Sequence, residues 1–125
     1  MIIRVTMDNA EVVMRKMVEM FATGDISELG AVVADDYHDH QGLHGVAVRV
    51  TEGFRQVVDA ARAGAVGLSV TVADLVADGD RAAARLRWRG VSPTGEPVDR
   101  ETIDIIRTRD GRAVEHWGAA LEPVD

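Results

Sequence analysis

The chain has 125 residues, 46% of them hydrophobic, which suits one compact domain spanning residues 1–125. Its sequence contains no apolar stretch long enough to span a membrane, and its net charge of −7 argues against nucleic acid or anionic membranes as partners. The absence of cysteine excludes disulfides and thiolate chemistry, so we expect a cytoplasmic protein.

The N-terminal half predicts three helices. A capping-box pattern at Asp8, followed by apolar residues at helical spacing, predicts a helix over residues 9–22 that Gly24 ends. A second capping signature predicts a short helix over residues 26–33. Helical spacing of apolar residues, among them a phenylalanine, predicts a third helix over residues 51–63.

The second half of the chain changes to the two-residue period of β-strands. Residues 68–77 and 81–91 alternate between apolar and polar side chains, and two further runs flank a turn near the C-terminus. Together they predict an antiparallel meander of four strands. We therefore expect an α+β fold in which three N-terminal helices pack in the concave face of a strongly curved, mostly antiparallel sheet, forming a cone-shaped α+β barrel.

The final hairpin, residues 104–121, carries Asp104 and His116 among apolar residues. A two-residue turn in its Arg-Asp-Gly sequence would place Asp104 opposite Trp117, on the face that His116 does not share. A three-residue loop would place Asp104 opposite His116, on one face. Both faces of the hairpin mix polar and apolar residues, so the sequence leaves open whether the acid and the imidazole meet in a pocket or lie on an outer face.

Three segments in this order carry a resemblance to a known family: "DDYHDH", "VADGDRAAARLRWRG" and "TIDIIRTRDGRAVEHWG". The chain resembles the SnoaL-like polyketide cyclases of the nuclear transport factor 2-like superfamily over nearly its whole length. The resemblance implies a deep apolar pocket, acid/base chemistry without a cofactor, and a homodimer. It also implies that Asp104 and His116 line the pocket, with His116 as acid/base and Asp104 orienting it. The expected reaction is an aldol-type cyclisation, or a related isomerisation, of a hydrophobic polyketide-like small molecule.

The polar segment "DDYHDHQGLHG", residues 35–45, is expected to be irregular. Tyr37 and His40 match a Tyr-x-x-His pattern that the resemblance implies at the cavity mouth, Tyr37 as a hydrogen-bond donor and His40 as a second base. Gln41 falls close to the position of a proton-shuttling aspartate in ketosteroid isomerase, where glutamine could only bind a carbonyl. The expected substrate-binding residues are Gln41, Phe54, Trp88, Thr102, Ile106 and Gly118.

Gly118 departs from the family pattern. Cyclases of this family place a catalytic aspartate two positions beyond the residue that matches His116, and here that position is glycine. Glycine cannot move a proton, which leaves two alternatives open. One is a ligand-binding or interaction module with a degenerate pocket. The other is an epoxide hydrolase or hydratase on the same scaffold, of which epoxide hydrolysis is weakened most by the missing acid because it positions water with paired carboxylates.

A histidine-rich segment and a row of arginines suggest other functions. His38, Asp39, His40 and His44 lie close enough in the sequence for a zinc or iron site, although the resemblance implies no metal and we expect none. Three arginines share the strand face opposite Trp88, where we expect them to contact solvent or a dimer partner; the alternative is that one of them clamps an anionic substrate. They are Arg85, Arg87 and Arg89.

Overall fold

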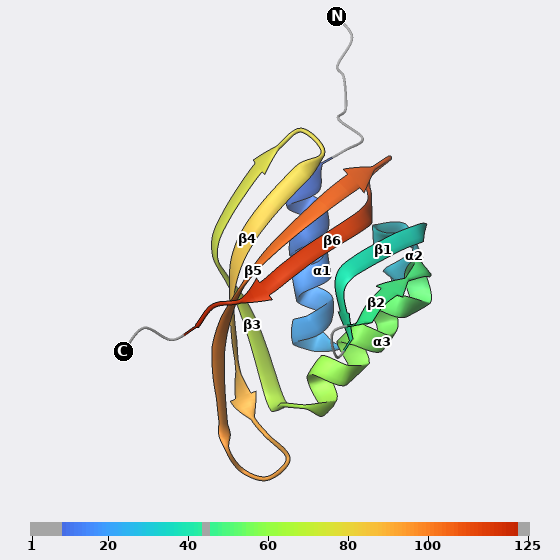
Figure 1. Ribbon diagram of the computed structural model, residues 1–125. Helices are drawn as coiled ribbons and strands as arrows, with labels where there is room; N and C mark the ends of the chain where they lie inside the picture. Colours follow the sequence, from blue (N-terminus) through green and yellow to red (C-terminus); the bar gives the residue numbers. More distant parts are fainter. Residues whose placement is uncertain (1–8, 44–45, 123–125) are drawn as a thin grey trace, which may run out of the picture.

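The computed structural model describes residues 9–43 and 46–122, which form helices packed against one mixed sheet (Figure 1). The helices are α1 (Ala10–Thr23), α2 (Leu29–Val32) and α3 (Val50–Ala63). The strands are β1 (Val33–Leu43), β2 (Val46–Arg49), β3 (Val66–Asp78), β4 (Arg81–Val91), β5 (Pro97–Arg109) and β6 (Arg112–Ala120). None of the helices in these two ranges is long and apolar enough to cross a membrane.

Helix α1 lies within one residue of its predicted bounds. Its N-cap is Asn9, whose side-chain oxygen accepts a hydrogen bond from the backbone N–H of Val12 at 3.2 Å. The predicted cap, Asp8, lies outside the described residues. Gly24 ends the helix as predicted, because its φ of 77° is in the left-handed region that glycine adopts without strain. Cap and stop signals next to an amphipathic run therefore located this helix correctly.

Helix α2 is shorter than the predicted 26–33. The carboxylate of Asp25 accepts a hydrogen bond from the backbone N–H of Ser27, which forms a turn where the sequence suggested a cap. Val33, the last residue of the predicted helix, instead begins β1. Helix α3 begins one residue before its predicted start, and its Arg62 donates hydrogen bonds of 2.9 Å to the last carbonyls of α1, which joins the two helices.

Strand β1 occupies most of the segment that we expected to be irregular, so that prediction was wrong. It pairs in parallel with β6 on one side and antiparallel with β2 on the other. Because side chains alternate along a strand, Tyr37 and Asp39 point to the buried face, whereas His38 and His40 point to the other. Pairing with β6, which is distant in sequence, stabilises this polar strand, and local propensity gives no sign of it.

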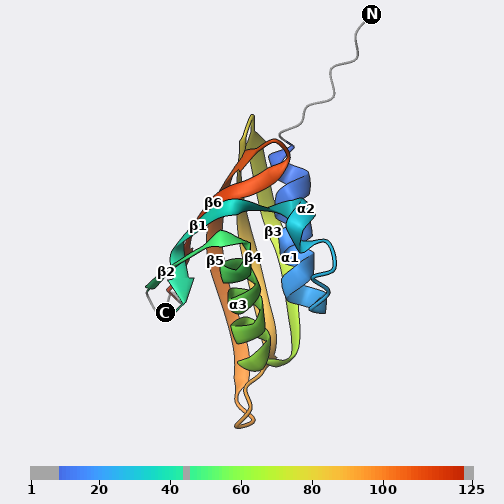
Figure 2. The same cartoon turned by 90° about the vertical axis from the view of Figure 1, so that its right-hand side faces the viewer.

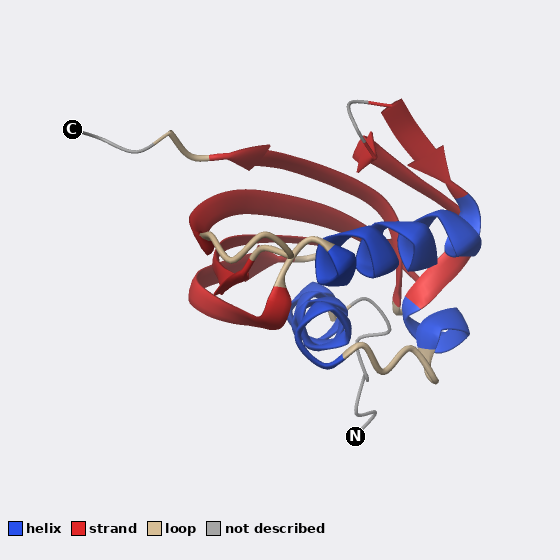
Figure 3. Ribbon diagram, turned by 90° about the horizontal axis from the view of Figure 1, so that it is seen from below, coloured by secondary structure: helices blue, strands red, loops and turns tan. Residues whose placement is uncertain are grey.

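The sheet has the order β2-β1-β6-β5-β4-β3, in which β3 to β6 form the predicted meander. All three helices lie on its concave side, as the view in Figure 2 shows. Seen from below, the strands curve around α1 and α3 but do not close (Figure 3), and β2 and β3 remain as edges. The fold class is thus confirmed as a cone of helices against a curved sheet, with an open sheet in place of a closed barrel.

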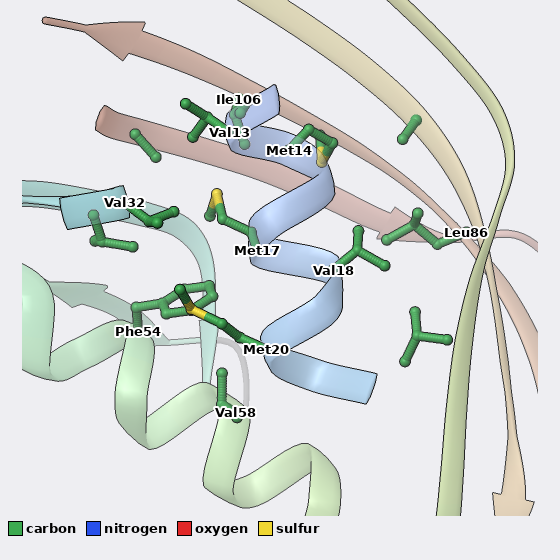
Figure 4. Close-up of a cluster of buried hydrophobic side chains, with 14 of the residues drawn as sticks. Val13, Met14, Met17, Val18, Met20, Val32, Phe54, Val58, Leu86 and Ile106 are labelled. Carbon is green, nitrogen blue, oxygen red and sulfur yellow. The ribbon is translucent and has the colours of Figure 1, made fainter. Parts of the chain in front are cut away.

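The core lies between α1 and the sheet (Figure 4). The methionine stripe of α1, with Met14, Met17 and Met20, is at most 4% exposed and packs toward Phe54 of α3 and the inner face of the strands. Burying a side chain of this size stabilises the fold by about 1.5 to 3 kcal/mol. Methionine is flexible enough to fill irregular space beside a cavity, and the same stripe continues into the wall of the pocket described below.

Candidate active site

The β5–β6 hairpin decides which side chains face the interior, and its register is neither of the two predicted. The turn is the two-residue type, with φ of 54° and 76° at its Asp-Gly residues. A bulge in β6 beside the turn then adds one residue to that strand. As a result His116 pairs with Ile106, and Asp104 pairs with Gly118. The bulge returns His116 to the face that carries Asp104, so the two share a face although they are not directly opposed.

His116 lies between two carboxylates. Its Nδ1 is 2.7 Å from Oδ1 of Asp39, and its Nε2 is 2.7 Å from Oδ1 of Asp104. The three side chains are 13%, 3% and 9% exposed, in the order His116, Asp39, Asp104. A neutral imidazole has one N–H and could donate to only one of these oxygens, whereas an imidazolium donates to both. The geometry therefore favours the protonated ring.

The electrostatics agree with that assignment. Burial by itself would lower the pKa of His116, but the hydrogen bonds to Asp104 and Asp39 and the charges of both carboxylates outweigh it and raise the pKa to about 9. Burial likewise acts to raise the pKa of Asp39, yet the hydrogen bond and charge of His116 and the backbone N–H groups of Gly42 and Gln41 hold it below its usual value. The protonated ring thus lies between two carboxylates.

A second hydrogen-bond chain orients Asp104 from its other side. The indole N–H of Trp88 donates to the hydroxyl of Thr102 at 2.8 Å, and that hydroxyl lies 2.6 Å from Oδ2 of Asp104. Because an indole can only donate, the Thr102 oxygen must accept from Trp88, and its own hydrogen must point to the carboxylate. Asp104 is therefore an acceptor at both oxygens, held in one orientation by β4 and β6.

Asp39 is not among the predicted catalytic residues, because the sequence suggests it only as a possible metal ligand. Its Oδ1 accepts the backbone N–H groups of Gln41 and Gly42 at 3.0 Å each, in addition to His116. These bonds hold the carboxylate where β1 runs beside β6. Alternation of Tyr37, Asp39 and Gln41 was the available signal, but it has meaning only once the segment is known to be a strand.

Tyr37 presents a buried hydroxyl to the same region. The residue is 1% exposed, and its oxygen makes no hydrogen bond of ordinary geometry within residues 9–43 and 46–122. Burial, then the negative charge of Asp39 and a side-chain hydrogen-bond interaction with it, and last the charge of Asp104, raise the pKa of this phenol well above 10, so it keeps its proton. The ring of Tyr37 borders a cavity that a ligand could enter, and its hydroxyl lies in the electrostatic field of the two carboxylates.

These groups lie in a cavity of about 420 Å³ between α1, α3 and the sheet, large enough for a drug-sized molecule. Its wall is largely apolar, and the polar groups gather around His116. The lining residues are Met14, Met17, Val18, Phe21, Tyr37, Asp39, Gln41, Gly42, Leu43, Phe54, Val57, Ala60, Ala61, Leu86, Trp88, Arg100, Thr102, Asp104, Ile106 and His116.

Most of the predicted site residues border this cavity. They are Asp104, His116, Tyr37, Gln41, Phe54, Trp88, Thr102 and Ile106. His40 does not: its Nε2 is 2.9 Å from a carboxylate oxygen of Glu115 and its ring stacks on Trp117 at 4.9 Å, on the outer face. Tyr37 and His40 are three apart, an odd number, so a strand turns them to opposite sides. The expected position of His40 at the cavity mouth is corrected accordingly.

Gly118 sits beside the site without lining the cavity. A Cβ built on it would clash with the side-chain oxygen of Gln41 and lie 2.9 Å from Oδ1 of Asp104. The glycine therefore leaves room beside β6 for the side chains of Gln41 and Asp104. In place of a second acid at this position, the chain has an amide from β1.

The metal alternative finds no support in the described part of the chain, where no group of three His, Asp or Glu side chains is arranged to hold an ion. The rings of His38 and His40 do lie together on the outer face, with centroids 3.9 Å apart. His44, the third member of the suggested group, lies outside the described residues.

An α+β domain with an open, curved sheet around an apolar cavity belongs to the nuclear transport factor 2-like class. The chain itself is a member of the SnoaL-like polyketide cyclase family, whose model matches residues 11–120. No protein of curated function matches it.

Solved structures share the fold. IdmH from Streptomyces antibioticus is 30% identical, with 90% of this chain and 91% of that chain covered and a TM-score of 0.77. TsrD from Streptomyces laurentii is 24% identical over 88% and 86% of the two chains, with a TM-score of 0.75. A SnoaL-like polyketide cyclase from Agrobacterium tumefaciens is 18% identical over 95% and 94%, with a TM-score of 0.77. The two less similar structures support the fold alone.

Proposed function

We propose that the protein is an acid/base enzyme that needs no cofactor and enolises a hydrophobic, carbonyl-bearing small molecule of the polyketide type. The observation that carries the proposal is the array of Asp39, His116 and Asp104 at the wall of an apolar cavity. Family membership supports the choice of substrate class. Buried ion networks are costly to maintain, and they occur at sites where the chemistry requires them more often than elsewhere.

The roles differ from those expected from the sequence. Because His116 is protonated at neutral pH, it cannot serve as the base, and Asp104 takes that role. Asp104 accepts one hydrogen bond at each oxygen and keeps lone pairs for a proton. The three hydrogen bonds to Oδ1 of Asp39 help to hold the pKa of that carboxyl below its usual value, which makes Asp39 a poor base. His116 positions Asp104 and compensates the negative charge of both acids.

The reaction then balances without an outside reagent. Asp104 takes the proton from the carbon beside a carbonyl. The C–H electron pair forms a carbon–carbon double bond, and the π pair of the carbonyl moves onto its oxygen to give an enolate. Tyr37 turns its O–H to that oxygen and donates a hydrogen bond, which stabilises the developing charge in a site of low polarity. In an aldol closure the enolate carbon forms a bond to a second carbonyl carbon of the same molecule, and the resulting alkoxide takes the proton back from Asp104.

Exchange of carbon-bound hydrogen tests the proposal. We expect the protein to accelerate replacement of the C1 hydrogens of 2-tetralone by deuterium in D₂O, followed by NMR. Asp104→Asn should lower the protein-dependent rate by about 100-fold or more, because the amide keeps the shape but cannot take the proton. Glu115→Gln is the matched control, since it removes a carboxylate from the outer face of β6 and should leave the rate unchanged.

The alternative of a ligand-binding module predicts a different result. Such a protein would bind 2-tetralone, detectable by quenching of tryptophan fluorescence, and would exchange its hydrogens no faster than the Asp104→Asn variant does. Binding without accelerated exchange in the wild type would therefore refute the enzymatic proposal. The argument for this alternative is Gly118, because a glycine at this position leaves the site without a further acid.

A further inference from the structure

Arg100 is the single arginine or lysine, within the described ranges, that lines the cavity. It lies on β5 two and four residues before Thr102 and Asp104, so the two-residue period of the strand turns it to the same face. It is exposed to solvent, so this end of the cavity can be reached from outside the protein. Its guanidinium carbon lies 5.9 Å from the centre of the Trp88 ring.

The guanidinium of Arg100 makes no ion pair within the described ranges and lies beside the Trp88 ring. Nothing in residues 9–43 and 46–122 offers it a hydrogen bond or a carboxylate within 4.0 Å. The three arginines of β4, by contrast, all pair with carboxylates on the outer face: Arg85 with Asp74 and Glu101, and Arg87 and Arg89 with Asp99. None of those three can reach a ligand in the cavity, so the alternative that one of them clamps a substrate does not hold. Arg100 is the cation that remains.

The charge of the cavity is polarised along β5. At the inner end, the two carboxylates and the His116 imidazolium sum to one negative charge, which repels an anion. At the open end, Arg100 attracts one. Arg100 and Asp104 are four residues apart, so their Cα atoms are separated by roughly 13 Å at about 3.3 Å per strand residue. Attraction at one end and repulsion at the other select a single direction of entry.

We propose that the substrate is an elongated hydrophobic carboxylate that binds Arg100 through its acid group and extends its enolisable carbonyl inward to Tyr37 and Asp104. This deepens the proposed function and rests on it for the identity of the reacting end. The apolar middle of the molecule lies against Phe54 and Trp88. Arg100 is thus the residue that determines specificity for an acid over its neutral ester or amide.

A pair of matched probes tests the acid preference at equilibrium, without turnover. Biphenyl-4-carboxylate and biphenyl-4-carboxamide have nearly the same shape and differ in charge, and binding of each can be measured by calorimetry. We expect the wild type to bind the carboxylate about five-fold more tightly, the magnitude of a partly exposed ion pair. Arg100→Gln should reduce that ratio to about one, and Arg100→Lys should keep most of it.

Arg89→Gln is the matched control, because it removes the same charge from a neighbouring strand on the outer face. It should leave the ratio as in the wild type. An unchanged ratio in Arg100→Gln, or an equal loss in Arg89→Gln, overturns the proposal.

Failure of this proposal can be distinguished from failure of the proposed function. If 2-tetralone exchange depends on Asp104 but the ratio of carboxylate to carboxamide affinity is the same in the wild type and in Arg100→Gln, only the inference about substrate charge is refuted. If the ratio depends on Arg100 and no exchange is accelerated, the acid-binding site stands and the enzymatic reaction is refuted.

Discussion

Titration of His116 should govern how the stability of this protein depends on pH. The pKa of His116 is about 9 in the folded chain, against 6.5 for an unperturbed histidine in the unfolded chain. A pKa raised by folding stabilises the native state fully below pH 6.5, and this contribution is lost as the pH rises through 9. At 1.36 kcal/mol per pKa unit, the loss is about 3 kcal/mol. The lowered pKa of Asp39 reflects the same contact and is not added to it.

The assay is urea unfolding at pH 6, 7.5, 9 and 10, followed by tryptophan fluorescence. Between pH 6.5 and 9 the free energy of unfolding should fall by about 1.4 kcal/mol per pH unit, because the native state holds one proton more than the unfolded state. His116→Gln, which has nothing to titrate at this position, should lose that slope.

A second measurement does not depend on the folding of any variant. In the wild type, NMR should find that the His116 ring titrates near pH 9. His38 serves as the internal control, because partial burial and the charges of Arg49 and His40 lower its pKa below 6.5. A His116 ring that titrates at pH 6.5 or below, or a wild type whose stability is flat across that range, would refute the ion array and with it the assignment of Asp104 as the base.

Three further substitutions test the supports of the site and the fold. Trp88→Phe removes the indole donor to Thr102, so we expect a loss of about 1 kcal/mol in urea unfolding and slower 2-tetralone exchange; unchanged exchange would contradict the orienting role. Gly118→Ala should destabilise by about 1 kcal/mol through crowding of the Gln41 side chain and the Asp104 carboxylate, and Gln41→Ala in the same chain should recover only the part due to Gln41; additive effects of the two changes would disprove the contact with Gln41. Asn9→Ala should lower thermal stability by about 1 kcal/mol through loss of the α1 cap while Asn9→Asp retains it, and equal effects of both would show that the cap contributes nothing.

The elements that the sequence predicted well are those whose pattern is local. Helix α1 has a complete apolar stripe and a glycine stop, and β4 was predicted over its observed span, Arg81–Val91. Their periodicity reflects burial against one neighbouring layer, which is encoded in the residues themselves. The prediction for α2 ran one residue too far at its C-terminal end, because Val33 is equally compatible with a helix end and a strand start. Only its pairing with β6 decides between the two.

The candidate site could be predicted only in part, because two of its determinants are not local. Asp104 and His116 share a face through a bulge in β6, a one-residue irregularity that the turn sequence does not reveal. Asp39 joins them because β1 runs parallel to β6, so that Asp39 and His116 are register partners although 77 residues separate them. Because side chains alternate along β1, Asp39 points to the cavity and its neighbour His40 points to the outer face.

By itself, the amino-acid sequence determined the class of fold, the family resemblance and the residue types available for acid/base chemistry. Those properties follow from periodicity, composition and short motifs, each of which is contained within a few consecutive residues. The tertiary structure alone decided which carboxylates form hydrogen bonds with His116 and which of them is free to take a proton. It also decided that Arg100 lies at the solvent-exposed end of the cavity. Proton affinity and charge complementarity depend on what lies within a few ångströms in space, and in this sheet those neighbours come from strands far apart along the chain.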